Sequence, residues 1–228
     1  MDQINAVELA KYIDHTCITA LATSEDIRKL CREAVEYGFH CVCVNPRWVS
    51  LAADELDKTG VAVCSVAGFP LGADTTAIKV AQAKDVIMAG ADEVDMVADL
   101  AAVLEGDIKF LDRQFHAMVK ACSNMRPKVL LKVIIESAAL NHDQIQLVCE
   151  SANRCGVDFV KTSTGLNPAG GATIEAVQLM KLSAPKCKVK AAGGIRTLEQ
   201  ALAMIQAGAE RIGTSAGIAI LNELKAGQ

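Results

Sequence analysis

The chain has 228 residues, of which 51% are hydrophobic and 22% charged, so it can build one large core and lacks the composition of a disordered protein. Its formal net charge is −4 with both signs interspersed, which argues against a nucleic-acid-binding surface. Since no run approaches the roughly 18 apolar residues of a membrane span and the start resembles no signal peptide, we expect a cytoplasmic protein without a membrane partner.

The nine cysteines are spread through apolar segments without a C-x-x-C pair. Cys41 and Cys43, in CVCV, would face the same side of a strand. We therefore expect reduced cysteines that act as small hydrophobic residues. His40, His116 and His142 have no H-x-x-x-H or H-x-H spacing, so the sequence predicts neither a metal site nor a cofactor.

Strand-like and helix-like segments alternate along the whole chain. The strand-like runs are 12–16, 41–45, 61–69, 92–98, 129–136, 157–163, 188–194 and 211–215. The helix-like segments are 24–38, 74–90, 111–122, 143–156, 173–183, 198–208 and 216–225. Two capping boxes support helix starts, at Asn141 with Gln144 and at Thr197 with Gln200.

This alternation, without a break in composition, predicts one (β/α)8 TIM barrel. The barrel would have an N-terminal helical extension and form a single catalytic domain over residues 1–228. The first strand run is short and polar, which leaves a doubly wound open sheet as the alternative architecture.

Ionisable residues stand inside several of the apolar strand runs. They are Asp14, Asp95, Lys132, Lys161 and Lys190. A single such lysine most often reaches solvent at a strand end. Five at equivalent places favour an active site, because a barrel enzyme builds its site from the C-terminal ends of its strands. Lys132 is interpreted either as a balance for the carboxylates or as a structural lysine. His15 either orients Asp14 or lines the barrel, and the lining role is favoured.

Lys161 and Lys190 would lie on neighbouring strands about 4.8 Å apart. Like charge and burial both lower a lysine pKa, and we expect the acidic residues to offset only part of this effect. At its reference pKa a lysine is only ~0.04% free amine at pH 7, so such a shift matters. The pattern predicts a lysine nucleophile that forms a Schiff base with a carbonyl.

Glycines follow the last strand runs, where barrels bind phosphate. Gly165 follows the first of these lysines, Gly193 and Gly194 follow the second, and Gly213 precedes Ser215 at the start of the final helix. Glycine lets the backbone approach a ligand, and a helix N-terminus attracts an anion. The sequence thus predicts a phosphorylated small carbonyl compound as substrate.

The order of short motifs resembles the deoxyribose-phosphate aldolase family from about residue 11 to 217. These motifs are IDHT, VNP, AGFPLG, EVDMV, LLKVIIES, FVKTSTG, KAAGGIRT and RIGTSAG. The resemblance implies a metal-independent class I aldolase of deoxyribonucleotide catabolism. It would cleave 2-deoxy-D-ribose 5-phosphate reversibly into acetaldehyde and D-glyceraldehyde 3-phosphate, as a homodimer or higher homo-oligomer.

The resemblance also implies residue roles. Lys161 matches the Schiff-base lysine, Lys190 the second lysine that takes part in proton transfer, and Asp95 the acid/base residue that acts through water. Asp14 matches a supporting carboxylate. The predicted substrate- and phosphate-binding residues are Thr162, Gly165, Gly193, Gly194, Ser215 and Lys132.

Two departures from the family pattern affect these expectations. Leu166 and Ala216 stand where some members carry a lysine and a second serine, so backbone N–H groups would carry more of the phosphate binding. The tyrosine-ended tail of some members is absent from the sequence, which predicts slower turnover or another group in that role. The competing interpretations are a barrel isomerase or lyase using Lys161 as a general base, and a non-catalytic sugar-phosphate sensor.

Overall fold

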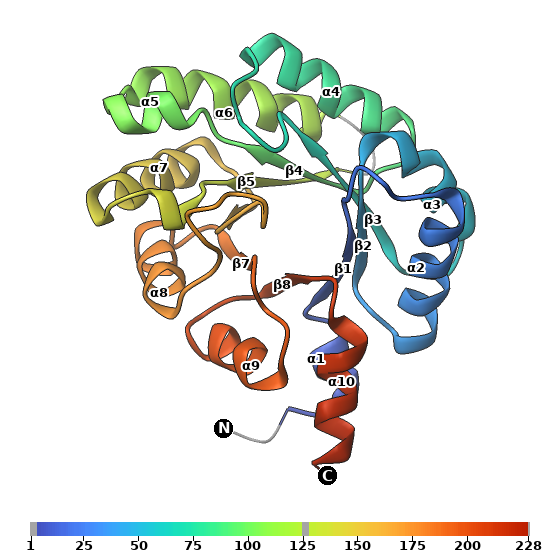
Figure 1. Cartoon of the computed structure of the whole chain (residues 1–228). Coiled ribbons are helices and arrows are strands. Elements are labelled where there is room, and N and C mark those ends of the chain that lie inside the picture. Colours follow the sequence, from blue (N-terminus) through green and yellow to red (C-terminus); the bar gives the residue numbers. More distant parts are fainter. Residues whose placement is uncertain (1–3, 125–127, 228) are drawn as a thin grey trace.

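The computed structural model describes residues 4–124 and 128–227, and its strands form a closed barrel in sequence order (Figure 1). The strands are β1 (Ile13–Cys17), β2 (Cys41–Val44), β3 (Ala62–Ala67), β4 (Glu93–Val97), β5 (Leu130–Ile134), β6 (Phe159–Lys161), β7 (Lys188–Ala192) and β8 (Arg211–Thr214). All neighbours pair in parallel, and β1 closes the barrel against β8 with Ile13 opposite Ile212. The predicted (β/α)8 barrel is confirmed, and the open-sheet alternative is wrong.

Helices surround the barrel. They are α1 (Ala6–Ala10), α2 (Ser24–Tyr37), α3 (Val49–Glu55), α4 (Thr76–Met88), α5 (Leu100–Glu105), α6 (Ile108–Ser123), α7 (His142–Cys155), α8 (Ile174–Ser183), α9 (Leu198–Gln206) and α10 (Gly217–Ala226), with 3₁₀ turns at Pro46–Trp48 and Ser137–Ala139. Both predicted capping boxes are present, at Asn141 and at Thr197. The N-terminal helical extension is confirmed as α1, which lies beside α10 (Figure 1).

The sequence analysis did not identify α3 and α5. They have seven and six residues, so each offers too few turns for a helical period to show. Asp99 caps α5 through the backbone N–H of Ala102, a signal that the sequence contains and that we did not use. The prediction of one domain over 1–228 includes residues 1–3, 125–127 and 228, which lie outside the described residues.

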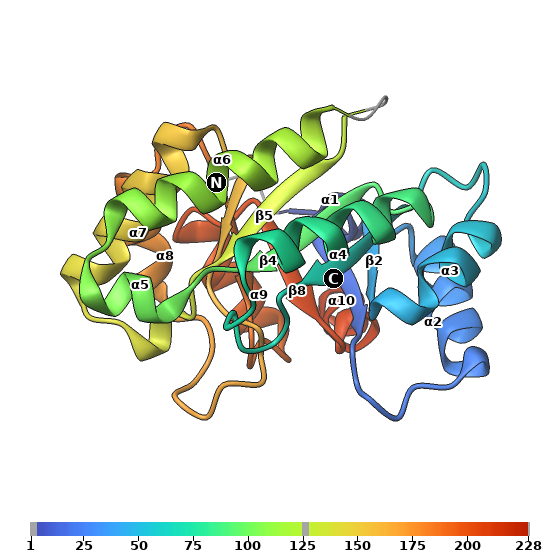
Figure 2. The ribbon, with the colours of Figure 1, turned by 90° about the horizontal axis from the view of Figure 1, so that it is seen from above.

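The apolar core lies between the outer faces of the strands and the helices, and Val, Ile, Leu and Ala dominate it. Burying this surface is the main force that closes the barrel. All nine cysteines are free thiols, eight of them buried, as expected for small hydrophobic residues. Among the described residues, every helix is too short or too polar to cross a membrane. The segments that follow β1 and β6 extend from the same side of the barrel (Figure 2).

One lysine is buried outside the barrel interior. Lys79, on α4, donates its Nζ hydrogen bonds to the Val97 carbonyl at 2.9 Å and to Gln114 Oε1 at 3.4 Å. Burial lowers the pKa of Lys79 to about 8, and Asp99 and Asp74 oppose only part of this shift. Lys79 therefore ties the end of β4 to α4 and α6 at an electrostatic cost.

This cost predicts a pH-dependent stability. The folded chain binds the Lys79 proton less tightly than the unfolded chain, so its contribution to the free energy of unfolding rises between about pH 8 and the ordinary value of 10.5. Above about pH 8, the free energy of unfolding measured in urea should therefore rise for the wild type relative to Lys79→Met. Lys84→Met, at an exposed lysine of the same helix, is the control. A difference that stays constant with pH would contradict the prediction.

Candidate active site

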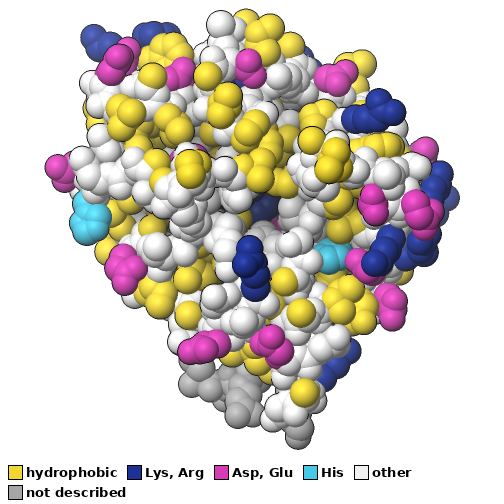
Figure 3. All heavy atoms as spheres, in the orientation of Figure 1, with side chains coloured by type: hydrophobic (Ala, Val, Ile, Leu, Met, Phe, Trp, Pro, Cys, Tyr) yellow, Lys and Arg dark blue, Asp and Glu magenta, His cyan; other side chains and the backbone are white. Residues whose placement is uncertain are grey.

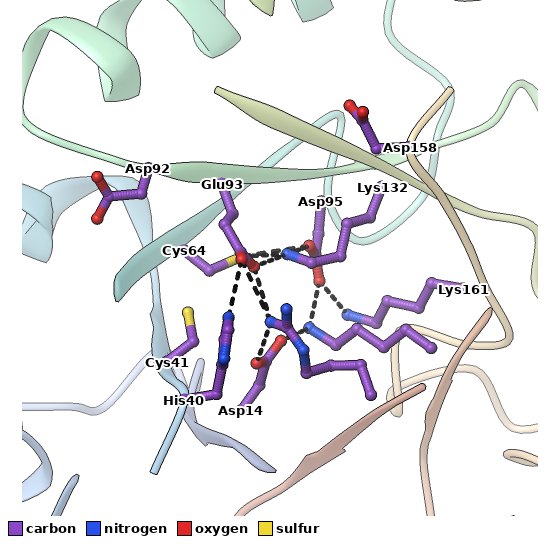
Figure 4. Close-up of polar contacts among 12 residues, drawn as sticks. Asp14, His40, Cys41, Cys64, Asp92, Glu93, Asp95, Lys132, Asp158 and Lys161 are labelled. Atoms are coloured by element: carbon purple, nitrogen blue, oxygen red, sulfur yellow. Dashed lines mark hydrogen bonds and ion pairs between the residues drawn. The ribbon is translucent and has the colours of Figure 1, made fainter. Parts of the chain in front are cut away.

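The ionisable residues predicted within the strands meet inside the barrel. Asp14 lies on β1, Asp95 on β4, Lys132 on β5, Lys161 at the end of β6 and Lys190 on β7, and all are buried. Figure 4 shows that the labelled side chains of Asp14, Asp95, Lys132 and Lys161 point toward one another. Ion pairs join these four and Lys190 into one network. The expected convergence of these side chains is confirmed.

Asp95 lies at the centre of this network. Its Oδ2 accepts hydrogen bonds from the Nζ atoms of Lys161 and Lys190, both at 2.8 Å, and its Oδ1 accepts one from Lys132 at 2.7 Å. Cys64 donates its thiol hydrogen to Oδ1 at 3.1 Å. Burial alone would raise the pKa of Asp95, but the three ammonium groups hold it well below its ordinary value. Asp95 is thus an anion that joins three lysines at one point.

Lys190 has a second carboxylate partner. Its Nζ lies 2.5 Å from Asp14 Oδ2, and Arg211 donates to Asp14 Oδ1 at 2.7 Å. Burial alone would raise the pKa of Asp14, but Lys190 and Arg211 hold it below its ordinary value. Asp14 therefore lies where a carboxylate supporting the second lysine is expected.

Of the two expectations about these lysines, their proximity is confirmed, but the acidic residues offset more of the pKa lowering than expected. Lys161 and Lys190 are direct neighbours across β6 and β7, as predicted. Burial alone would lower the pKa of Lys190, but Asp14 and Asp95 raise it well above its ordinary value, and burial of Lys132 is likewise outweighed by Asp95. For Lys190 and Lys132, the carboxylates therefore raise the pKa by more than burial and neighbouring positive charge lower it. That Lys161 supplies the free amine stays a prediction.

Glu93 and Arg211 extend the network away from the barrel mouth, and the sequence analysis missed both. Glu93 Oε2 lies 2.5 Å from Lys132 Nζ and 3.1 Å from Arg211 Nη1. Burial alone would raise the pKa of Glu93, but Lys132 and other neighbours hold it well below its ordinary value. The spacing in the sequence could have identified Glu93, because it precedes Asp95 by two residues and therefore shares the same face of the strand.

His15 does not line the barrel, so that expectation is wrong. Asp14 faces the interior, and its chain neighbour therefore faces outward. His15 Nε2 lies 2.8 Å from Glu33 Oε2, and its ring lies 5.0 Å from that of Phe39. His40 lies near the other end of the network, with its Nε2 3.5 Å from Glu93 Oε1.

The glycine-rich loops after β6 and β7 pack closely on each other. Ala172 donates its backbone hydrogen bond to the Gly193 carbonyl at 3.1 Å. A Cβ at Gly171 would lie 2.1 Å from the Gly193 oxygen, so only glycine fits there. Gly193 has φ +90°, and a Cβ on it would lie 3.4 Å from the Gly165 Cα. These glycines therefore permit contact between loops, a use that the sequence analysis did not anticipate.

Two hydroxyl groups near Lys161 differ in their partners. Thr162 donates to the Ala192 carbonyl and accepts from the Ala192 N–H, both at 3.0 Å, so its hydroxyl joins the ends of β6 and β7. Its predicted role in substrate binding stays a prediction. Ser163 is fully buried, and its Oγ has no hydrogen-bond partner among the residues that the structure describes. A substrate or water hydroxyl is the kind of group that satisfies such an atom.

Glu136 is a further residue that the sequence analysis missed. It follows β5 in the left-handed conformation, with φ 54° and ψ 53°. Its buried carboxylate accepts a hydrogen bond from the backbone N–H of Thr164. A non-glycine residue in this conformation costs about 1–3 kcal/mol. Glu136 thus holds the loop that follows Lys161.

The final loop leads into α10. Ser215 is exposed after β8, and Ala216 caps α10 without a side-chain hydrogen bond. By contrast, the side chain of Thr197 caps α9. The first backbone N–H groups of α10 can therefore bind an anion, as can the exposed Gly194 after β7.

The barrel also contains two groups of residues with metal-ligand chemistry. They are Cys43 with Cys64 and Asp95, and Asp14 with Cys41 and Glu93. Their carboxylates already form ion pairs with lysine or arginine, which a metal would have to displace. The predicted metal independence of the reaction stays a prediction. The mouth of the barrel forms a depression with a basic side chain inside it, near the centre of the face in Figure 3.

Comparisons with known proteins agree with this geometry. The model of the DeoC/LacD family of aldolases matches residues 8–223. A deoxyribose-phosphate aldolase of Thermococcus gammatolerans is 52% identical over 218 residues, covering 94% of this chain and 96% of the relative. One from Thermococcus kodakarensis is 51% identical over 221 residues, covering 96% and 97%.

A solved structure supports the same assignment. The deoxyribose-phosphate aldolase of Aeropyrum pernix, described as tetrameric, superposes with a TM-score of 0.90 at 35% identity, covering 98% of this chain and 94% of that one. The family match spans nearly the whole barrel, including every strand that carries the ion-pair network. The chain therefore belongs to the DeoC/LacD family of aldolases.

Proposed function

We propose that this chain catalyses the reversible aldol cleavage of 2-deoxy-D-ribose 5-phosphate into acetaldehyde and D-glyceraldehyde 3-phosphate. The observation that carries the proposal is the placement of Lys161 and Lys190 on one oxygen of Asp95 inside an aldolase barrel. The relatives named deoxyribose-phosphate aldolase support the substrate. The whole chain forms one catalytic domain. Its reaction belongs to deoxyribonucleotide catabolism.

Lys161 is the nucleophile in this proposal. Its neutral amine attacks C1 of the open-chain sugar, and loss of water gives an iminium that draws electrons from the C2–C3 bond. The iminium forms where the Lys161 nitrogen lies 2.8 Å from Asp95 Oδ2, so the carboxylate stabilises its positive charge.

Lys190 and Asp95 move the proton. The proton of the C3 hydroxyl leaves through water to the Lys190–Asp95 pair as the C2–C3 bond breaks and glyceraldehyde 3-phosphate departs. The remaining enamine is protonated at carbon and hydrolysed to acetaldehyde. Asp95 is the acceptor of the pair, because Asp14 and Asp95 raise the pKa of Lys190 and keep its amine protonated. The low pKa of Asp95 makes this carboxylate a weak base, so it holds the proton only transiently and returns it through water.

The phosphate binds at the loops after β7 and β8. Gly193 and Gly194 present backbone N–H groups there, and Ser215 stands at the N-terminus of α10. Leu166 is exposed and Ala216 has no hydroxyl, so neither side chain pairs with phosphate. Backbone donors and the end of α10 therefore supply most of the phosphate binding.

This arrangement predicts the effect of Ala216→Asp. The new carboxylate can cap α10 itself and repels a phosphate dianion, so KM for the phosphorylated sugar should rise about tenfold or more. The value of kcat/KM for unphosphorylated 2-deoxyribose should not fall. Ala216→Ser, which adds a hydroxyl without charge, is the matched control in steady-state assays. An equal loss on both sugars would contradict the phosphate assignment.

Trapping the Schiff base tests the proposed function. Incubation with acetaldehyde and borohydride, followed by peptide mass spectrometry, should show an ethyl group on Lys161. A barrel isomerase or lyase that uses Lys161 only as a general base would give no such adduct. A coupled assay for acetaldehyde release from 2-deoxyribose 5-phosphate separates the enzyme from a non-catalytic sensor.

The oligomeric state and the cellular location of the enzyme are inferred from a relative and from the cysteines. The tetrameric relative of Aeropyrum pernix supports a homo-oligomer, such as a homodimer or a larger assembly. The free thiols support a reducing, cytoplasmic location. Sedimentation of the purified chain would determine the number of subunits.

A further inference from the structure

The loop that follows Lys161 runs from residue 162 to residue 172 without helix or strand. Lys161 itself is fixed by the strands on both sides. Its carbonyl accepts a hydrogen bond from the Ile135 N–H at 3.0 Å, and the N–H of Thr162 donates to the Lys190 carbonyl at 3.0 Å. Beyond Thr162 this ladder of strand hydrogen bonds ends, so the position of the loop depends on its contacts with neighbouring loops.

Glu136 holds this loop on the side of β5. Its buried carboxylate accepts a hydrogen bond from the backbone N–H of Thr164. The backbone of the same turn contributes as well, since Ser137 donates its N–H to the Thr162 carbonyl at 2.9 Å. In the part of the chain that the structure describes, Glu136 is the one side chain outside the loop that forms a hydrogen bond with the backbone of the loop.

The backbone conformation of Glu136 makes this contact informative. The residue is left-handed, with φ 54° and ψ 53°, a conformation that glycine adopts freely and glutamate only at a cost. The neighbouring loops use glycine for such positions, among them Gly165 with φ +83° and Gly193 with φ +90°. A glutamate therefore stands where glycine would suit the backbone better, which indicates that its carboxylate has a role.

On its other side, the loop packs against the glycines that follow β7. A Cβ at Gly165 would lie 3.7 Å from the Gly193 Cα, and Ala172 donates its backbone hydrogen bond to the Gly193 carbonyl at 3.1 Å. Because β6 lies between β5 and β7 in the barrel, Glu136 and Gly193 contact the same loop from opposite sides. In the proposed function, Gly193 and Gly194 bind the phosphate through their backbone N–H groups.

We propose that Glu136 is a positioning residue for the phosphate group of the substrate: it fixes the loop after β6 at Thr164, and this loop in turn holds Gly193 in place. The inference rests on the proposed function, because it takes Gly193 and Gly194 as the site of the phosphate. Glu136 acts through the loop and not on the reacting carbon atoms. Without its carboxylate the loop loses this contact, whereas Lys161 keeps its strand hydrogen bonds.

Steady-state cleavage of 2-deoxyribose 5-phosphate and of unphosphorylated 2-deoxyribose tests this role. In Glu136→Ala, KM for the phosphorylated sugar should rise about tenfold, the scale of one lost hydrogen bond to a carboxylate. Its kcat, and kcat/KM for 2-deoxyribose, should change by less than about threefold, because the chemistry at Lys161 is unchanged. Glu136→Gln keeps an oxygen that accepts from Thr164 and should keep the KM of the wild type. Glu36→Ala, at an exposed glutamate of α2, is the control.

Glu136→Gly separates the contact from the conformation of the backbone. Glycine relieves the left-handed conformation, so this variant should melt within a few degrees of the wild type and still lose the preference for the phosphorylated sugar. The inhibition constant of inorganic phosphate against cleavage of 2-deoxyribose should rise about tenfold in Glu136→Gly and in Glu136→Ala, and stay unchanged in Glu136→Gln. If Glu136→Ala does not fold, Glu136→Gly compared with Glu136→Gln decides the matter.

The two sugars also distinguish failure of this inference from failure of the proposed function. A wild type that releases acetaldehyde from neither sugar would overturn the proposed function. A wild type that cleaves both sugars without preference would overturn the placement of the phosphate and this inference with it.

Three results would overturn this inference alone. The first is an unchanged preference for the phosphorylated sugar in Glu136→Ala and Glu136→Gly. The second is an equal loss on both sugars, because that would show a general structural role. The third is a loss in Glu136→Gln as large as in Glu136→Ala, because the amide retains the acceptor oxygen.

Discussion

Replacing Lys161 with arginine is expected to lower kcat/KM for cleavage of 2-deoxyribose 5-phosphate by roughly 10⁴-fold or more while the barrel stays folded. Guanidinium remains protonated at every accessible pH, so arginine can pair with Asp95 but cannot attack a carbonyl. The measurement is acetaldehyde release in a coupled assay, together with a thermal melt followed by circular dichroism.

The control for this variant is Lys109→Arg, at an exposed lysine on α6. It makes the same chemical change outside the barrel interior and should keep full activity. Retained aldol cleavage by Lys161→Arg would refute the role of Lys161 as nucleophile. A loss of activity that accompanies unfolding would be recognised from the melt.

Replacing Asp95 with asparagine is expected to lower both activity and stability. The amide has the shape of the carboxylate but no charge, so Lys132, Lys161 and Lys190 lose the anion that they share. Removing one partner of a buried ion pair costs about 3–5 kcal/mol of unfolding free energy. Activity should fall roughly 10²–10⁴-fold, because the proton relay and the support of the iminium both depend on this charge.

Urea unfolding and the coupled assay measure the two effects of Asp95→Asn. The pKa of Asp95 is depressed in the folded chain, so its contribution to stability is fully present above its ordinary value of 3.8 and is lost as pH falls below that value. The difference in free energy of unfolding between the wild type and the variant should therefore become smaller only in strong acid. Asp57→Asn, at an exposed aspartate, is the control. Equal stability of Asp95→Asn and the wild type near neutral pH would contradict the central role of this carboxylate.

Much of the fold was predictable because its signals are local. Each strand run of the sequence contains or overlaps an observed strand, and Asn141 and Thr197 cap helices as their spacing indicates. The short helices α3 and α5 were missed because two turns give little periodicity. Barrel closure depends on the pairing of β1 with β8, which no local pattern determines.

The sequence by itself determined which ionisable residues were expected to meet in the candidate site. Lys161, Lys190 and Asp95 stand out because charged side chains in apolar strands are costly unless paired, and period two places each on one face. Sequence alone did not say which face is the interior, and so His15 was placed wrongly.

Only the tertiary structure decided how the charges balance. Closure of the barrel brings the Nζ atoms of Lys161 and Lys190 to one oxygen of Asp95, and adds Glu93 and Arg211 behind them. Electrostatic energies depend on distances between strands that lie far apart in the chain, and period two gives a direction but not a distance. The same reason explains why the close contact of Gly171 with Gly193 became visible only in three dimensions.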